Sequence, residues 1–256
     1  VFGLVLGPEI DLRLFLQRWR HAFAVTETGH HGSRQSLQFF DRYGTAVHKV
    51  YLTADGDPAA YERLVARNRS ADQTPRIAVE PKAKASPAAP VDRSLLRAAW
   101  SALRDTHEFY GMLKRLSITR LQALCAVGPD LATPVACSGF WRLLQTVRDA
   151  DLPIMVFVTS PGVVQIHTGQ VGNLRVTGPW CNVLDARFNL HVRETAIADA
   201  FVVRKPSTDG IVTSLEIFDD DEDLMVQVFG RRKPGQPEWG RWRRIVEGLC
   251  GEPPEA

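Results

Sequence analysis

SLQFFDRYGTAVHKV at Ser36–Val50 and SLEIFDDDEDLMVQV at Ser214–Val228 are two versions of one pattern. In each, two runs of apolar and β-branched residues flank a short polar segment, which predicts a β-hairpin. The acidic run Asp219–Asp223 lacks the glycine and the terminal glutamate of an EF-hand loop, so a polar hairpin turn explains it better than a calcium site. The two hairpins predict that one antiparallel unit occurs twice in the chain.

The similarity extends beyond the hairpins at a single offset. Leu12, Phe23 and Val25 match Leu190, Phe201 and Val203, each pair 178 positions apart (190 − 12, 201 − 23 and 203 − 25). A fixed offset without gaps indicates duplicated structural units. We therefore predict the C-terminal part of a first unit at 1–73, a Pro- and Ala-rich linker at 74–91, and a complete second unit at 92–256. By the same spacing the first half is expected to be truncated, with roughly eighty residues belonging ahead of Val1.

The order of elements predicts the fold class. Helical patterns come first in the second unit, and short strands joined mostly by tight turns follow from Pro153. Short turns between successive strands indicate antiparallel pairing, and helices grouped ahead of such a sheet are typical of α+β proteins. We expect two similar halves, each a large antiparallel sheet with helices packed on it.

Composition excludes several classes of protein. The formal net charge of +2 over 256 residues argues against a protein whose main ligand is nucleic acid. The longest apolar run, Pro153–Val158, is too short to cross a bilayer, so no membrane insertion is expected. The four cysteines show no paired spacing for zinc or a disulfide framework. A reducing cytoplasm is the expected location.

The second unit opens with DRSLLRAAWSALRDTHEFYGMLKRLSITRLQAL, Asp92–Leu124. If this stretch is helical, one stripe contains Leu96, Trp100, Leu103, His107 and Tyr110. An imidazole in such a row is either a hydrogen-bonded core histidine or an axial ligand for a flat apolar cofactor such as haem. Position alone leaves both open. Ser117 is the expected N-cap of a following helix at Ile118–Val127.

Basic residues form a second group of candidates. If Leu12 and Leu14 face the core, Arg13 faces a cleft or solvent, and it differs from its counterpart His191. Arg120, Lys205 and Arg231–Lys233 fall near the ends of predicted elements. A set of such cations around an apolar slot would suit a ligand with two carboxylates, whereas solvated surface is the simpler interpretation of each.

Long motifs carry a family resemblance. DTHEFYGMLKRLSITRLQAL, QIHTG, GPWCNVLD, FNLHVRETAIADAFVVRKPSTDGIVTSLEIFD and FGRRKPGQPE resemble the cytoplasmic hemin-transport and hemin-degrading proteins encoded with bacterial haem-uptake systems. EIDLRLFLQRW and SLQFFDRYGTAVHKVYL from the first unit fit the same family. The resemblance covers nearly the whole chain except the linker and the tail. It implies two similar halves and one haem bound between a sheet and helices.

The resemblance also implies roles for particular residues. His107 matches the axial ligand of the haem iron. Arg13 matches the residue that reaches the opposite face of the haem and is the candidate catalytic residue, with Phe15 beside it. The remaining matches lie near the haem carboxylates or line the pocket: Arg120, Lys205, Gln227, Phe229 and Arg232. Phe229 is tyrosine in some relatives, so here it offers ring packing without a hydroxyl.

These observations support one leading hypothesis and two alternatives. The leading hypothesis is a cytoplasmic haem-binding protein that accepts imported haem for trafficking, for oxidative degradation that releases iron, or for both. Degradation would need an external electron donor. The alternatives are a pure haem carrier and a haem-responsive regulatory or nucleic-acid-binding module. Expected partners are a haem-uptake transporter or a haem oxygenase.

Overall fold

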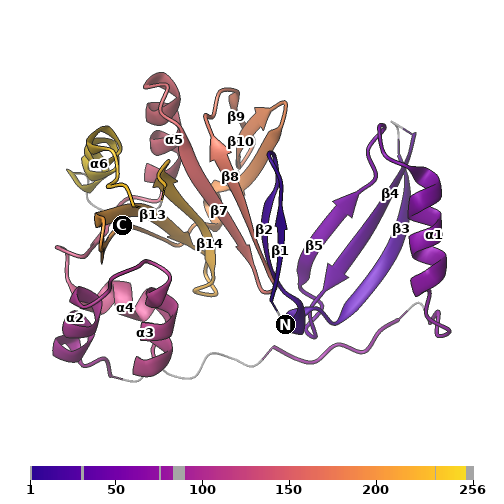
Figure 1. Cartoon of the computed structure of the whole chain (residues 1–256), viewed down its shortest axis with the longest axis horizontal. Helices are drawn as coiled ribbons and strands as arrows, with labels where there is room; N and C mark the ends of the chain where they lie inside the picture. The colour runs from indigo at the N-terminus through magenta and orange to yellow at the C-terminus, as the bar shows by residue number, and fades with distance from the viewer. Residues whose placement is uncertain (1, 30–31, 75, 83–89, 234, 252–256) are drawn as a thin grey trace. The chain divides into compact units, whose positions relative to one another are not determined.

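The computed structural model describes residues 2–29, 32–74, 76–82, 90–233 and 235–251. The predicted α+β class is confirmed, because the described part of the chain contains antiparallel sheets and six α-helices, and the first four of these helices follow one another without an intervening strand (Figure 1). Parts of the predicted linker, at 75 and 83–89, lie outside the described residues, and the predicted boundaries of the two halves stay a prediction. Across the described chain, every helix is too short or too polar to pass through a bilayer.

The chain packs into two units, which we describe separately. The first contains β1 (Phe2–Leu6), β2 (Asp11–Phe15), the 3-10 turn η1 (Leu16–Arg18), β3 (His21–Gly29), β4 (Gly32–Phe40), β5 (Ala46–Tyr51), α1 (Pro58–Asn68) and the first residues of β8 (Val163–Gly169). Here β2 pairs with β1 on one side and with β8 on the other, and β3, β4 and β5 form a second antiparallel sheet. Leu12, Val47 and Val163 make its small buried core.

The second unit contains the remaining elements. They are α2 (Arg93–Ser101), α3 (Glu108–Leu116), α4 (Arg120–Val127), β6 (Ala132–Pro134), α5 (Gly139–Asp149), most of β7 (Ile154–Ser160), β9 (Leu174–Thr177), β10 (Trp180–Asp185), β11 (Phe188–Arg193), η2 (Glu194–Ala196), β12 (Asp199–Ser207), β13 (Gly210–Phe218), β14 (Leu224–Gly230), α6 (Gly240–Glu247) and η3 (Gly248–Gly251). Its main sheet has the order β7-β14-β13-β12-β6, and β10 lies between β9 and β11 in a second sheet.

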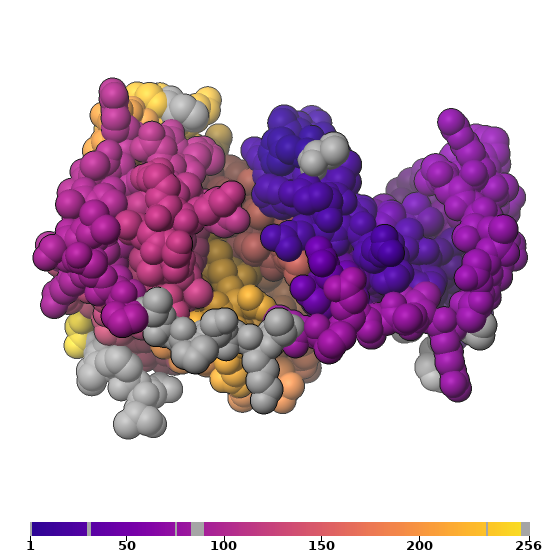
Figure 2. All heavy atoms as spheres, turned by 90° about the horizontal axis from the view of Figure 1, so that it is seen from below, coloured from indigo at the N-terminus to yellow at the C-terminus, as the bar shows by residue number. Residues whose placement is uncertain are grey.

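Helices cover both faces of the main sheet of the second unit (Figure 1). Successive side chains of a strand point to opposite faces, so Val202 and Leu215 pack with α5 and α6 while Phe201 and Val203 pack with α2, α3 and α4. Helices α2, α3 and α4 form one closely packed block in the space-filling view (Figure 2). The candidate residues of the second unit lie on this second face or beside it.

The duplication predicted from the sequence is confirmed in the backbone. An offset of 178 carries β3 onto β12 (199 − 21) and β4 onto β13 (210 − 32), with the same first and last residues. It also carries η1 onto η2 and the β-bulge after Phe39 onto the bulge after Ile217. Even the turns agree, because the carboxylates of Asp41 and Asp219 accept backbone hydrogen bonds from the residues two and four positions later.

The single helical stripe predicted from Leu96 to Tyr110 is wrong in its second half. Residues 92–124 form three helices, because the chain leaves the helical path after Ser101 and again after Leu116. Leu96, Trp100 and Leu103 are buried as predicted, but Tyr110 is 70% exposed. Ser117 is not the predicted N-cap. It takes a left-handed conformation that ends α3, and Thr119 caps α4 through a capping box with Gln122.

Candidate functional site

His107 lies at the N-cap position of α3, outside the apolar row in which the sequence placed it. Its side chain is 95% exposed. Nδ1 lies 2.5 Å from the Asp105 carboxylate, and the same oxygen accepts the His107 backbone N–H at 2.8 Å. A carboxylate on Nδ1 favours the tautomer with the proton there, which leaves the Nε2 lone pair free for a metal. The structure thus presents an accessible, oriented imidazole and not a core histidine.

Two further charges lie near this imidazole. The backbone hydrogen bond from His107 lowers the pKa of the Asp105 carboxyl, and the positive charge of Arg232 contributes in the same direction. Arg232 also contacts Asp209, with 3.4 Å between Nη2 and Oδ2. Because Thr208 donates its backbone N–H to the Arg104 carbonyl at 2.9 Å, the β12–β13 turn is fastened to the segment that carries His107. Arg232 is therefore a cation beside the predicted iron ligand.

Three other predicted residues meet in a buried cluster around Glu216 on β13. The Glu216 carboxylate, 0% exposed, accepts hydrogen bonds from Arg120 Nη1 at 2.8 Å, from Gln227 Nε2 at 2.8 Å and from Lys205 Nζ. Ser214 adds a hydroxyl donor at 3.2 Å. Arg120 comes from the first turn of α4, and the other side chains come from three adjacent strands of the main sheet. The expectation of solvated surface is therefore wrong for Lys205, whose side chain is 3% exposed.

Burial and ion pairing compete in this cluster. Burial lowers the pKa of Lys205 to about 8, although its attraction to Glu216 opposes that shift. Burial alone would raise the pKa of Glu216, but Arg120 and Lys205 outweigh it and lower the pKa to about 2. Each charge is thus held in place by its opposite, because an unpaired charge at this depth would be costly.

Phe109 connects the cluster to the histidine segment. It follows His107 by two residues, is 1% exposed and packs edge-on against Trp100 with 4.7 Å between ring centroids. The guanidinium of Arg120 lies 4.8 Å and the ammonium of Lys205 lies 4.5 Å from the centre of the Phe109 ring. Both distances fall within the range of cation–π attraction. One aromatic ring therefore supports both cations next to the chain segment that holds the imidazole.

Phe229 shares the sheet face of this cluster. Phe229 on β14 pairs with Ser214 on β13. Two residues further along the strands, Gln227 pairs with Glu216. Paired residues in an antiparallel sheet lie on the same face. The Phe229 ring packs edge-on against Phe157 of β7, with 5.2 Å between the ring centroids.

Arg13 and Phe15 lie together in the first unit, on β2. Arg13 is ion-paired with Asp11 two residues earlier, and about one third of each side chain is exposed. The Phe15 ring lies 5.7 Å from that of Phe2 on the paired strand β1. Leu12 is buried as expected, so Arg13 points away from that core.

Two residues of the site were missed in the sequence. Glu216 stands in β13, a strand that is buried over most of its length, and a carboxylate there signals a buried cationic partner. Asp105 could have been found from its spacing, because a carboxylate two residues before a histidine can reach its Nδ1. Each contacts residues that were predicted from the sequence: Asp105 contacts His107, and Glu216 contacts Arg120 and Lys205.

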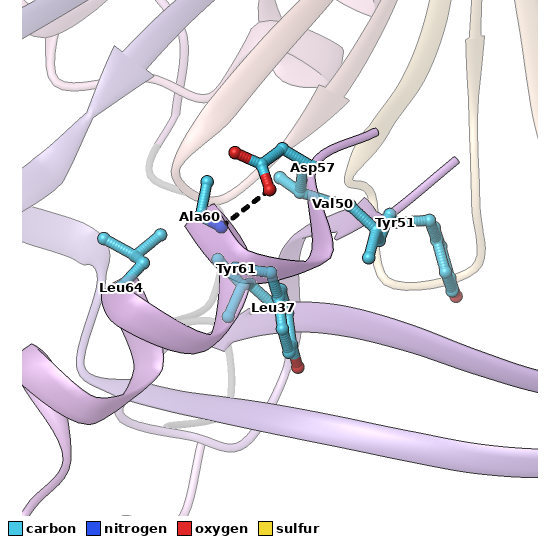
Figure 3. A pocket seen from close by; sticks show the side chains of 8 residues that line it. Leu37, Val50, Tyr51, Asp57, Ala60, Tyr61 and Leu64 are labelled. Carbon is cyan, nitrogen blue, oxygen red and sulfur yellow. Dashed lines mark hydrogen bonds between the residues drawn. The ribbon is translucent and has the colours of Figure 1, made fainter. Parts of the chain in front are cut away.

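Hollows in the first unit contain none of the predicted site residues. One, of about 260 Å³, lies between α1 and strands β4 and β5, and its walls include Leu37, Val50, Tyr61 and Leu64 (Figure 3). A larger one, of about 1200 Å³, lies along β3 and β4 and is bordered by residues 68–70, 72–74 and 76–78. His21 and Asp72 border the larger hollow and Asp57 the smaller one. Among the described residues, no group of three or more histidine, cysteine, aspartate or glutamate side chains is placed to hold a metal ion.

Residues 1–68 and 117–249 match the family model described as the haemin-degrading HemS.ChuX domain. Together these ranges cover well over half of the chain.

Named proteins with similar sequences and structures agree with that match. The chain is 42% identical to hemin transport protein HmuS of Yersinia pestis over 252 residues, which is 98% of this chain and 73% of that protein. It resembles holo-PhuS, a heme-binding protein from Pseudomonas aeruginosa, with a TM-score of 0.91, 45% identity and coverage of 97% and 72% of the two chains. It also resembles ChuS, an E. coli heme oxygenase, with a TM-score of 0.85, 40% identity and coverage of 97% and 74%.

Proposed function

The chain belongs to the HemS.ChuX family of haemin-degrading domains, and from this premise we propose that it binds haem as cargo and as a substrate for ring opening. Haem needs an axial nitrogen for iron, apolar and aromatic contact for the macrocycle and cations for its two carboxylates. The single observation that carries the proposal is the Asp105–His107 pair, which leaves an exposed Nε2 oriented for iron beside a group of cations.

His107 is the proposed iron ligand. Asp105 holds its ring through Nδ1 and keeps the proton away from Nε2. Since the imidazole is free of other contacts on its Nε2 side among the described residues, a planar ligand can approach it without displacing packed side chains.

The cations and aromatic rings are the proposed partners of the rest of the molecule. Arg120 and Lys205 on one side and Arg232 on the other offer positive charge to the haem carboxylates. Gln227 and Phe229 line the sheet face beneath them. By resemblance, Arg13 and Phe15 meet the opposite face of the haem.

Trafficking and degradation use the same bound state. Haem supplies the redox chemistry once an external donor provides electrons, whereas the protein orients the ring and excludes bulk water. Arg13 is the proposed catalytic residue by resemblance alone, and its guanidinium offers the hydrogen-bond donors that such a role needs. A pure carrier would share every other feature, so turnover separates the two.

The test is oxidation of bound haem. Protein loaded with hemin is mixed with a reductant and oxygen, and the absorption spectrum is followed with time. The proposal expects the haem spectrum to be replaced by that of an opened ring. In Arg13→Ala this replacement should be roughly a hundredfold slower or more, a drop of the size seen when one hydrogen-bonding catalytic group is removed. A haem spectrum that stays unchanged in the wild type would leave carriage as the function.

We further propose that the protein acts in the cytoplasm and exchanges haem with an uptake transporter or a haem oxygenase. The names of the relatives support exchange with a transport system. A direct test is transfer of haem to purified candidate partners, followed by the loss of the His107-dependent absorption band.

A further inference from the structure

The hairpin of β13 and β14 carries opposite charges at its two ends. Its turn consists of five consecutive acidic residues, Asp219–Asp223. At the other end, where β13 begins and β14 finishes, the chain continues with Arg231, Arg232 and Lys233. The length of β13 separates these ends by about 27 Å, at roughly 3.4 Å per residue. The second unit therefore has an acidic end and a basic end.

The basic end lies beside the segment that carries His107. Asp209, in the β12–β13 turn, accepts a hydrogen bond from Arg232 Nη2 at 3.4 Å. The neighbouring Thr208 donates its backbone N–H to the Arg104 carbonyl at 2.9 Å. Since Arg104 precedes His107 by three residues, the basic end and the proposed iron ligand belong to one connected part of the second unit.

Three cations at the basic end are open to a partner. The side chains of Arg104, Arg231 and Lys233 are exposed, and none of them has a hydrogen bond or an ion pair with another described residue. Two large apolar side chains at the same end are also exposed, Ile211 by 37% and Trp239 by 46%. We call these five residues the basic surface.

Trp239 is held at this end through its neighbour in the chain. The Glu238 carboxylate accepts hydrogen bonds from the Thr213 backbone N–H at 2.6 Å and from the Thr213 hydroxyl at 2.7 Å. Trp239 therefore stands near the first residues of β13, of which Ile211 is the second. Tryptophan and arginine are the residues most enriched among the side chains that anchor protein–protein interfaces.

The first unit shows that the fold does not require these cations. The loop from β5 to α1 is the counterpart of the loop from β14 to α6, and an offset of 178 carries Arg231 onto Thr53 and Lys233 onto Asp55 (231 − 53 and 233 − 55). The same connection is thus built with a neutral and an acidic residue at these places. The cations of the second unit are therefore available for an interaction.

We infer that the basic surface docks a small acidic one-electron carrier protein, which delivers electrons to the iron of bound haem. The inference rests on the proposed function, because ring opening needs an external electron donor. In each transfer the reduced carrier loses one electron and ferric iron gains it to become ferrous, so no bond is made or broken. Charge complementarity steers the carrier to the end that holds His107, while Asp219–Asp223 repel it at the other.

A nucleic acid fits the basic surface less well. Tight binding to its phosphates takes a long row of cations. The basic surface offers three, next to two apolar side chains, on a chain whose formal net charge is only +2.

The experiment follows the reduction of hemin bound to the full chain, without oxygen, by a reduced acidic [2Fe–2S] ferredoxin as the probe. In the wild type the second-order rate constant should fall roughly tenfold or more as the ionic strength rises from about 0.01 M to about 0.5 M, because salt screens the attraction. At about 0.1 M, Arg231→Glu with Lys233→Glu should lower the rate constant roughly tenfold or more. Dithionite, a small reductant that uses no docking surface, should reduce the iron at the same rate in both proteins.

Arg175→Glu with Arg193→Glu is the matched control. It makes the same change in net charge at two exposed arginines of the second sheet, on β9 and β11. At about 0.1 M, where the Debye length is about 10 Å, it should leave the ferredoxin rate within about threefold of the wild type. Thermal melting and a hemin titration verify that each variant is folded and loaded.

Four results would overturn the inference. They are an unchanged ferredoxin rate in the double variant of the basic surface, an equal loss in the control, an equal loss with dithionite, and loss of salt-dependent binding to a DNA duplex while ferredoxin still reduces the iron at the wild-type rate. The last would assign the surface to nucleic acid. A wild-type chain that does not bind hemin would instead refute the proposed function.

Discussion

His107 shows how a residue gains chemistry from its place at the start of a helix. His107 is the N-cap residue of α3, so it lies at the end of the helix and its side chain is exposed to solvent. Few side chains pack against it, and Asp105 orients it instead. One Asp105 carboxylate oxygen contacts both the backbone N–H and the Nδ1 atom of His107. The imidazole is therefore ordered by a polar contact and remains accessible, a combination that a core position would not allow.

Asp105 yields the first prediction at this scale. Asp105→Ala should weaken hemin binding by roughly tenfold or more, since loss of the partner of a metal-ligating histidine typically reduces metal affinity by 10- to 100-fold. The measurement is a hemin titration followed by absorption. Asp209→Ala is the matched control, because it removes a neighbouring carboxylate that contacts Arg232 and not the imidazole. Equal losses in both variants would contradict a specific role for Asp105.

The residues also mark the limit of sequence reasoning. The environment of His107 was predicted as apolar because a continuous helix was assumed from Leu96 to Tyr110. The break before His107 depends on the turns of residues 105–109, for which helical periodicity carries no signal. A new helix after Ser117 was predicted, but the left-handed conformation of Ser117 was not. Lys205 was expected to be solvated because burial depends on Glu216, which lies 11 positions away in sequence and reaches it only across a strand pair.

At the scale of elements, strand pairing determines which side chains meet. β12, β13 and β14 bring Lys205, Glu216 and Gln227 to one face because each is an alternate residue of its own strand. The alternation is readable in sequence, and the hairpins at Ser36–Val50 and Ser214–Val228 were predicted for that reason. The short strands β6 and β9 were missed, since three or four residues give too little pattern.

The packing of α6 on β14 gives a prediction about an element. A Cβ added at Gly230 would lie 2.4 Å from Cγ of Trp242, whose indole is fixed by a 3.0 Å hydrogen bond to the Thr213 carbonyl. Gly230→Ala should therefore lower the free energy of unfolding by about 1–3 kcal/mol, the usual cost of overpacking. Urea unfolding measures this. Gly248→Ala, which meets open space, is the matched control and should change stability little. Similar losses in both would refute the packing argument.

At the scale of the whole molecule, the duplicated strand pattern carries different side chains in its two copies. The same strands and the same turn carry an exposed set of charges in the first unit and a buried charged cluster in the second. The offset of 178, visible in sequence, predicted the equivalence of the strands correctly. It could not predict which copy would be covered by α2, α3 and α4, because burial depends on tertiary packing that the repeated residues do not encode.

The buried cluster should also make global stability depend on acid. The pKa of Glu216 is lower in the folded protein than its ordinary value of 4.5, so its contribution to stability is present above about pH 4.5 and is lost as the pH falls toward about 2. The full loss is on the order of 3 kcal/mol. Unfolding free energies measured between pH 5 and 2 should fall more steeply for the wild type than for Glu216→Gln, which has no proton to gain. Parallel curves would contradict this account.

The most direct test of the central claim is a hemin titration of the wild-type chain and of His107→Ala, followed by absorption spectroscopy. The account predicts that the wild type binds one hemin with the spectrum of a histidine-ligated iron, and that the variant binds at least tenfold more weakly with that spectrum lost. Because the His107 side chain is almost fully exposed, unfolding of the two ligand-free proteins should differ by less than about 0.5 kcal/mol. An unchanged spectrum and affinity in His107→Ala would contradict the claim that this imidazole holds the iron.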